Sequence, residues 1–141
     1  MREPGACGAG VRGTQGQLEK PRGDYTEHGG RRAAEILLSS SHPPTAVFAA
    51  NDLSALGVLA ALKHRGMSAP EDLSLIGFDN TVLAQFGYID LTTIDTPRQD
   101  MGATAVTLLT ARIDNTGRPT HPAQLTPRLI VRSTTVPHPG V

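Results

Sequence analysis

The hydrophobic positions along the chain form short continuous runs that alternate with longer stretches of helical spacing. Residues 45–50 ("TAVFAA") and 72–78 ("DLSLIGF") are short and carry apolar residues on both faces of a strand. Strands covered by helices on both faces have this composition, so we predict a buried strand in each run. Shorter runs at 91–95 ("LTTID") and 128–135 ("RLIVRSTT") predict a third and a fourth strand.

Three other segments, residues 27–40, 52–65 and 98–113, place their apolar residues at the i, i+3, i+4 spacing of a helix. Thr26 is a suitable N-cap for the first helix, because its hydroxyl can accept a backbone N–H. Gly66 is a suitable stop for the second, because glycine commonly follows the last helical residue.

The predicted order of elements is α-β-α-β-β-α-β, which is typical of an α/β fold with a mostly parallel sheet. The two strands that flank the 52–65 helix should be parallel neighbours, because such crossover units join parallel strands of one sheet. Residues 1–23 contain six glycines without periodicity and predict an irregular or flexible segment. The folded domain is expected at 24–136, followed by a short tail at 137–141.

Composition and charge exclude several classes of protein. The 141 residues include 13 basic and 13 acidic side chains, so no basic surplus points to direct nucleic-acid binding. Cys7 is the single cysteine, which excludes an internal disulfide framework and leaves a thiolate metal site without partners. The sequence has neither an apolar stretch of membrane-spanning length nor a secretory signal pattern, so we expect a cytoplasmic protein.

The strongest candidate for a binding site is the edge where the first two strands end. Asn51 follows the 45–50 strand and Asp79 follows the 72–78 strand. Ligands of open parallel sheets bind beyond the carboxyl ends of the strands. An amide and a carboxylate there suit a hydroxylated or heterocyclic small molecule. Asp52 is expected to cap the following helix. The alternative, that Asn51 and Asp79 only form turns, stays open.

Several motifs resemble the effector-binding domain of bacterial repressors of the lactose/galactose repressor (LacI/GalR) family. They are "PPTAVFAANDLSALGVLAALKHRGMSAPEDLSLIGFDN", "LTTIDTPRQDMGATAV" and "PRLIVRSTT", which occur in the family's order within residues 23–135. The resemblance implies a periplasmic-binding-protein-like fold with two subdomains around a small-molecule effector, a sugar or sugar-like metabolite, and a homodimer in the full-length protein.

The resemblance also implies site residues. The asparagine of the "AND" motif and the first aspartate of the "GFDN" motif contact the effector in such proteins, and here they are Asn51 and Asp79. Phe48 corresponds to an aromatic residue that lines the same pocket, although it also fits a plain strand core. Arg2, in an R-x-x-G stretch before Gly23 and Asp24, corresponds to a further effector contact.

The sequence also departs from the family pattern. No helix-turn-helix precedes the domain, so we expect a carboxyl-terminal piece of a repressor that does not itself bind operator DNA. The 98–113 helix resembles one that packs in the missing subdomain, and its apolar stripe should therefore lack a partner and be loosely held. Residues 81–90 are unusually apolar and either plug the end of the sheet or, with Leu56, form the dimer contact.

Other chemistry has little support in the sequence. The five histidines never pair at i, i+4, and no nucleophile elbow occurs, so we expect no metal, no cofactor and no enzyme activity. A Rossmann-type enzyme would need a phosphate-binding glycine turn after the first strand, where the chain has "AANDL". A sugar-binding protein of a transport system shares the fold and is the alternative function.

Overall fold

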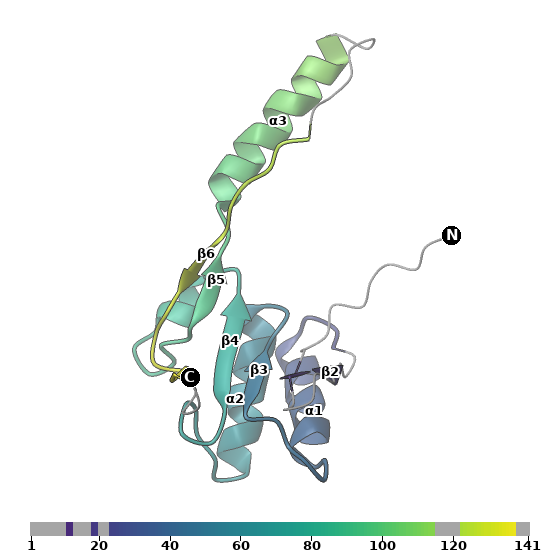
Figure 1. Cartoon of the computed structure of the whole chain (residues 1–141). Coiled ribbons are helices and arrows are strands. Elements are labelled where there is room, and N and C mark those ends of the chain that lie inside the picture. Colours follow the sequence, from purple (N-terminus) through teal and green to yellow (C-terminus); the bar gives the residue numbers. More distant parts are fainter. Residues whose placement is uncertain (1–10, 13–17, 20–22, 115–121, 138–141) are drawn as a thin grey trace, which may run out of the picture.

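The computed structural model describes residues 11–12, 18–19, 23–114 and 122–137. Figure 1 shows a body of sheet and helices from which one long helix projects. Most of the segment predicted to be irregular, including Arg2 and Cys7, lies outside the described residues. Within that segment, the two-residue strands β1 (Val11–Arg12) and β2 (Leu18–Glu19) form an antiparallel pair, and β1 lies close to β3.

The main sheet has the strand order β3-β4-β5-β6. Its strands are β3 (Ala46–Phe48), β4 (Ser74–Phe78), β5 (Thr93–Asp95) and β6 (Arg128–Ile130). The first three are parallel and β6 is antiparallel to β5, which confirms the predicted parallel pair around the second helix. β6 is shorter than the predicted 128–135 strand, because the chain then turns toward the start of β4, where Thr134 accepts a hydrogen bond from the Leu75 N–H at 2.7 Å.

Helices α1 (Glu27–Leu38) and α2 (Asp52–His64) pack against each other and on one side of the sheet (Figure 1). The Thr26 hydroxyl accepts the Gly29 N–H at 2.9 Å, so the predicted N-cap of α1 is confirmed. The two helices approach closely at Gly57, where a Cβ atom would overlap the Glu27 carbonyl oxygen and lie 2.5 Å from the Arg31 nitrogen. Glycine is therefore required at this crossing for steric reasons.

The hydrophobic core lies between these two helices and the sheet. Val47 and Leu75 point into it from neighbouring strands, whereas Ala46 and Phe48 on the other face of β3 are exposed. The prediction that helices cover both faces of the strands is therefore wrong for the part of the chain that the structure describes. An apolar run predicts that a strand is buried, but it does not show whether the described residues supply the helices for both faces of the sheet.

Helix α3 (Arg98–Asp114) projects from the body, and none of its seventeen residues is buried. The segment that leads into β6 returns beside it (Figure 1). Its apolar residues are largely exposed; the exposed fraction is 50% for Met101 and 61% for Leu109. Within the described part of the chain, the apolar stripe of α3 is therefore exposed to solvent.

The apolar segment between β4 and β5 contains the short 3₁₀-helix η1 (Val82–Gln85). Ala84 is buried at the end of the sheet, as a plug would be. Phe86 and Tyr88 are exposed and stack on each other, with ring centroids 5.7 Å apart. The segment therefore both closes the core and presents an aromatic surface. No helix in the described ranges has the length and apolar character to cross a membrane.

Candidate ligand-binding site

The candidate site is the edge of the sheet where β3, β4 and β5 end. Val47 pairs with Leu75 and Phe48 with Ile76, in parallel register. Asn51 and Asp79, each three residues beyond the last of these paired positions, therefore leave the sheet at the same edge. The structure thus meets the geometric condition of the sequence prediction, that the amide and the carboxylate follow neighbouring strands.

Asn51 is the N-cap of α2, with extended backbone angles (φ −155°, ψ 170°). Its Oδ1 accepts the Ser54 N–H at 2.8 Å, and its Nδ2 donates to the Tyr25 carbonyl oxygen at 3.0 Å. The prediction that Asp52 caps this helix is wrong. The reason is that a cap residue must be non-helical, and Asp52 is already the first residue of the helix. An asparagine amide has one further N–H and one further lone pair, and these stay available to a ligand.

Asp52 is completely buried and binds three donors of the protein. Its Oδ2 accepts the backbone N–H and the hydroxyl of Thr81, at 2.6 and 2.9 Å, and its Oδ1 accepts the Thr93 hydroxyl at 2.6 Å. Gly77 leaves the space for this carboxylate, because a Cβ there would lie 2.5 Å from Oδ1. Asp52 thereby joins α2, β5 and the turn after β4.

The turn after β4 holds its backbone in an unfavourable conformation. Asp79 has φ +104° and Asn80 has φ +49°, whereas side chains other than glycine favour negative φ. Such residues cost about 1–3 kcal/mol each and persist only where the surroundings hold them. Here the Asp79 N–H donates to the Ile94 carbonyl at 2.9 Å, and Thr81 is bound by Asp52. Strained residues of this kind cluster at ligand sites.

The Asp79 carboxylate is half-buried at the end of β4. Burial and the negative charge of Asp52 raise the pKa of Asp79 above its usual value, and the guanidinium of Arg98 acts in the opposite direction. A partly desolvated carboxylate forms stronger hydrogen bonds with hydroxyl or N–H donors than a solvated one. Asp79 is therefore suited to binding a polar ligand.

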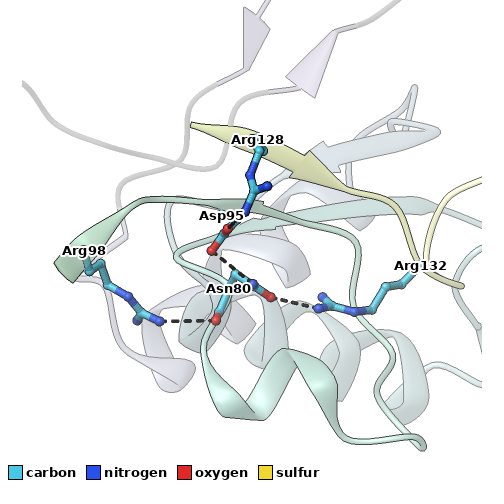
Figure 2. Close-up of polar contacts among 5 residues, drawn as sticks. All are labelled: Asn80, Asp95, Arg98, Arg128 and Arg132. Atoms are coloured by element: carbon cyan, nitrogen blue, oxygen red, sulfur yellow. Dashed lines mark hydrogen bonds and ion pairs between the residues drawn. The ribbon is translucent and has the colours of Figure 1, made fainter. Parts of the chain in front are cut away.

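Asn80, the next residue, is surrounded by charged side chains (Figure 2). Its Nδ2 donates to Asp95 Oδ1 at 3.1 Å, its Oδ1 accepts from Arg132 at 2.8 Å, and its backbone oxygen accepts from Arg98 at 3.4 Å. Arg128 binds the other oxygen of Asp95 at 3.2 Å. Hydrogen bonds from Asn80 and Arg128 hold the pKa of Asp95 below its usual value. The members of this cluster come from three separate stretches of the chain, residues 80, 95–98 and 128–132, so no local sequence pattern predicts it.

Phe48, the third predicted site residue, ends β3 on the face opposite the core. Its side chain is 43% exposed, and its ring packs edge-to-face on Phe78, with centroids 6.5 Å apart. The two phenyl rings offer an apolar surface on the strands that lead to Asn51 and Asp79. Arg2, the fourth predicted residue, lies outside the described residues.

An open hollow of about 530 Å³ lies next to the Asn80 cluster, where α3 begins. Its lining comes from two segments, residues 95–100 and residues 125, 126 and 128. Neither Asn51 nor Asp79 contributes to it. In the described ranges, no three His, Cys, Asp or Glu side chains come together in a way that could hold a metal ion.

Comparison with protein families gives a match over most of the chain. A family model described as a periplasmic binding protein-like domain matches residues 10–135. Among curated proteins, the HTH-type transcriptional repressor PurR of Escherichia coli O1:K1 is 41% identical over 111 residues, which are 79% of this chain and 33% of that protein. The repressor CytR of Escherichia coli strain K12 is 50% identical over 88 residues, covering 62% of this chain and 26% of CytR. The chain thus spans about a third or less of these relatives.

Solved structures give the same result for the fold. A LacI transcriptional regulator from a Rhodococcus species has a TM-score of 0.74 and 37% identity, and the match covers 80% of this chain and 41% of that one. A LacI family regulator from Enterococcus faecium with bound ribose has a TM-score of 0.74 and 34% identity, covering 84% and 43%. The complex of the regulator CelR with cellobiose has a TM-score of 0.74 and 32% identity, covering 79% and 34%.

Proposed function

The chain belongs to the periplasmic-binding-protein-like domain family, and on that premise we propose that it senses a small sugar as the effector domain of a LacI-type regulator. Its homologues PurR and CytR are transcriptional repressors, and similar solved structures are LacI-type regulators. The regulated activity would be binding of operator DNA by a helix-turn-helix, an element that the described residues do not contain. Relatives of this kind support regulation rather than transport or catalysis.

The ligand site that we propose is the sheet edge with Asn51 and Asp79, flanked by Phe48. The observation that carries this proposal is the parallel pairing of β3 and β4, since it brings both polar residues to one edge. Asp79 would accept hydrogen bonds from sugar hydroxyls, and the spare groups of Asn51 would add one donor and one acceptor. The exposed ring of Phe48 would cover an apolar face of the sugar ring. Arg2 stays a proposed fourth contact on sequence grounds alone.

A sugar is the favoured class of ligand, because two similar regulators were solved with ribose and with cellobiose. The described site offers carboxylate, amide and phenyl groups, which can bind the hydroxyls and the apolar face of a sugar ring. Binding would favour one arrangement of two subdomains over another and thereby alter affinity for DNA. A regulator that acts on operator DNA would work in the cytoplasm.

We also propose that the intact regulator is a homodimer, with the surface formed by Val82, Phe86 and Tyr88 as part of the contact. These three side chains are 66%, 38% and 85% exposed, although all are apolar or aromatic. A symmetric contact buries one such patch against its copy, and a stable pair needs about 800 Å² per subunit. Sedimentation of the intact regulator beside its Phe86→Asp variant tests this proposal, because it compares the fraction of dimer in the two proteins.

The ligand proposal is tested by calorimetric titration of the chain with a panel of pentoses, hexoses, disaccharides and nucleobases. For any compound that binds, we expect the Asp79→Ala variant to bind at least about tenfold more weakly, because hydrogen bonds to a charged group contribute about 1.5–3 kcal/mol. Asp72→Ala is the control, since it removes a carboxylate that precedes β4 at the opposite edge, where it accepts the Ser68 N–H at 2.8 Å. Equal affinity of the parent and Asp79→Ala would contradict the proposed site.

A further inference from the structure

The direction of α3 relative to the sheet depends on a small number of contacts at its base. None of its residues is buried, so helix packing within the described residues does not hold it. Two segments join it to the sheet: Thr96 and Pro97 after β5, and the residues that lead back into β6. Within the described chain, the orientation of α3 therefore depends on polar contacts at or beside these two segments.

Asn80 contacts residues at the ends of these segments: it binds Asp95 and Arg98 at the entry to α3 directly, and it reaches Arg128 through Asp95 (Figure 2). Its backbone oxygen accepts from Arg98, the first residue of α3, and its Nδ2 binds Asp95 at the end of β5. Asp95 in turn binds Arg128, the first residue of β6. Asn80 Oδ1 accepts from Arg132, two residues beyond β6. One side chain and one peptide oxygen of Asn80 thus bind the entry to α3, and Asp95 links this entry to Arg128, where the return from α3 reaches the sheet.

Asn80 also follows Asp79 directly, and both residues have positive φ. The Asp79 carboxylate and the contacts of Asn80 therefore belong to adjacent residues of one turn. Asparagine suits this position, because it adopts positive φ more readily than most residues and its amide can donate and accept at once.

We infer that Asn80 is a positioning residue that fixes the orientation of α3 relative to the Asp79 carboxylate. The part of the inference that concerns a ligand on Asp79 rests on the proposed function, whereas the part that concerns α3 does not. If the ligand site at Asp79 and the base of α3 are coupled, the coupling is reciprocal. A ligand on Asp79 then changes the equilibrium between held and released α3 by some factor, and holding α3 changes the affinity for the ligand by that same factor.

Residual dipolar couplings of backbone amides in the 141-residue chain test this inference, because they report the orientation of α3 relative to the sheet. Asn80→Gly removes the side-chain contacts with Asp95 and Arg132, keeps the backbone oxygen that accepts from Arg98, and still permits positive φ. We expect the parent to fit one common alignment for β3–β5 and α3. In Asn80→Gly, the α3 couplings should become smaller, because the link from residue 80 to Asp95 is lost, while those of the sheet are unchanged, which also shows that the variant folds.

Asp90→Gly is the matched control, because Asp90 has φ +41° and its carboxylate binds the Ser133 N–H at 3.2 Å, away from α3. The control should keep the common alignment of the parent. Unchanged α3 couplings in Asn80→Gly, or an equal loss of alignment in Asp90→Gly, would overturn the inference.

A second titration separates this inference from the proposed function. Ribose is added to the parent, and amide shifts near Asp79 are followed with the α3 couplings. If ribose leaves the Asp79 region unperturbed while Asn80→Gly still releases α3, the result counts against ribose as the ligand and supports Asn80 as the positioning residue.

Discussion

Helices α2 and α3 have similar lengths and comparable numbers of apolar side chains, but their surroundings differ completely. Seven of the thirteen residues of α2 are buried, against none of the seventeen of α3. α2 packs between α1 and the sheet, whereas α3 leaves the body after two residues of linker (Figure 1). The difference shows that the apolar spacing of a sequence defines a helix, while burial depends on whether the described chain also supplies a partner surface.

The same difference separates the two halves of the proposed mechanism. The body fixes the sheet edge with Asn51 and Asp79, through buried contacts such as those of Asp52. The α3 region is held through exposed polar groups, and we expect it to move more easily. The curated relative PurR is about three times as long as the matched region, so the match does not cover the whole of that protein.

The largest expected effect is on the stability of the body. Leu75→Ala should lower the free energy of unfolding by about 2–5 kcal/mol, because Leu75 is fully buried in the core. Leu109→Ala, on the exposed face of α3, should change it by less than about 0.5 kcal/mol. Urea denaturation of both variants beside the parent gives the comparison. A large loss of stability in Leu109→Ala would show that α3 packs more firmly than described.

The second prediction compares two glycines in helices. Gly57→Ala should destabilise the chain by about 1–3 kcal/mol, despite the better helix propensity of alanine, because the new Cβ overlaps α1. Gly102→Ala has open space around its Cβ and should stabilise α3 locally by about 0.5–1 kcal/mol.

Hydrogen exchange measures the local effect of Gly102→Ala, and global unfolding measures the effect of Gly57→Ala. Slower exchange of α3 amides in Gly102→Ala, without a change in the midpoint of global unfolding, would confirm that α3 unfolds separately. The account of a close helix crossing fails if Gly57→Ala is as stable as the parent.

The third and smallest prediction concerns pH. The lowered pKa of Asp95 in the folded state means that its contacts add stability above the unfolded-state pKa, and that this stability is lost as the pH falls through the folded-state pKa. The effect should be small, because Asp95 lies near the surface and water screens its interactions. Acid titration of Asp95→Asn should therefore show a weaker loss of α3 order on acidification than the parent shows. Identical acid profiles would exclude a role for Asp95 at the base of α3.

Much of this fold can be predicted from the sequence, because the signals that define it are local. The cap at Thr26, the apolar runs of β3 and β4, and the helical spacing of α2 depend on neighbouring residues. The resemblance to LacI-type repressors is supported by relatives and solved structures alike. The adjacency of Asn51 and Asp79 follows from the crossover rule for parallel strands.

The remaining errors concern tertiary contacts. The sequence does not distinguish Asn51 from Asp52 as cap, because both residue types cap helices well and the choice depends on where the backbone becomes helical. Asp52 instead lies under the sheet edge, in space left by Gly77. The role of Asn80 depends on Asp95, Arg98 and Arg132, which lie 15 to 52 residues further along the chain.

The most direct test of the account is a map of amide chemical shifts in the chain on titration with the sugar that binds most tightly. We predict that the perturbed amides cluster at residues 48–54 and 78–81, around the edge with Asn51 and Asp79, and that Asp79→Ala removes the response. Perturbations that cluster instead at residues 95–100 and 125–128, around the open hollow at the base of α3, would contradict the proposed site.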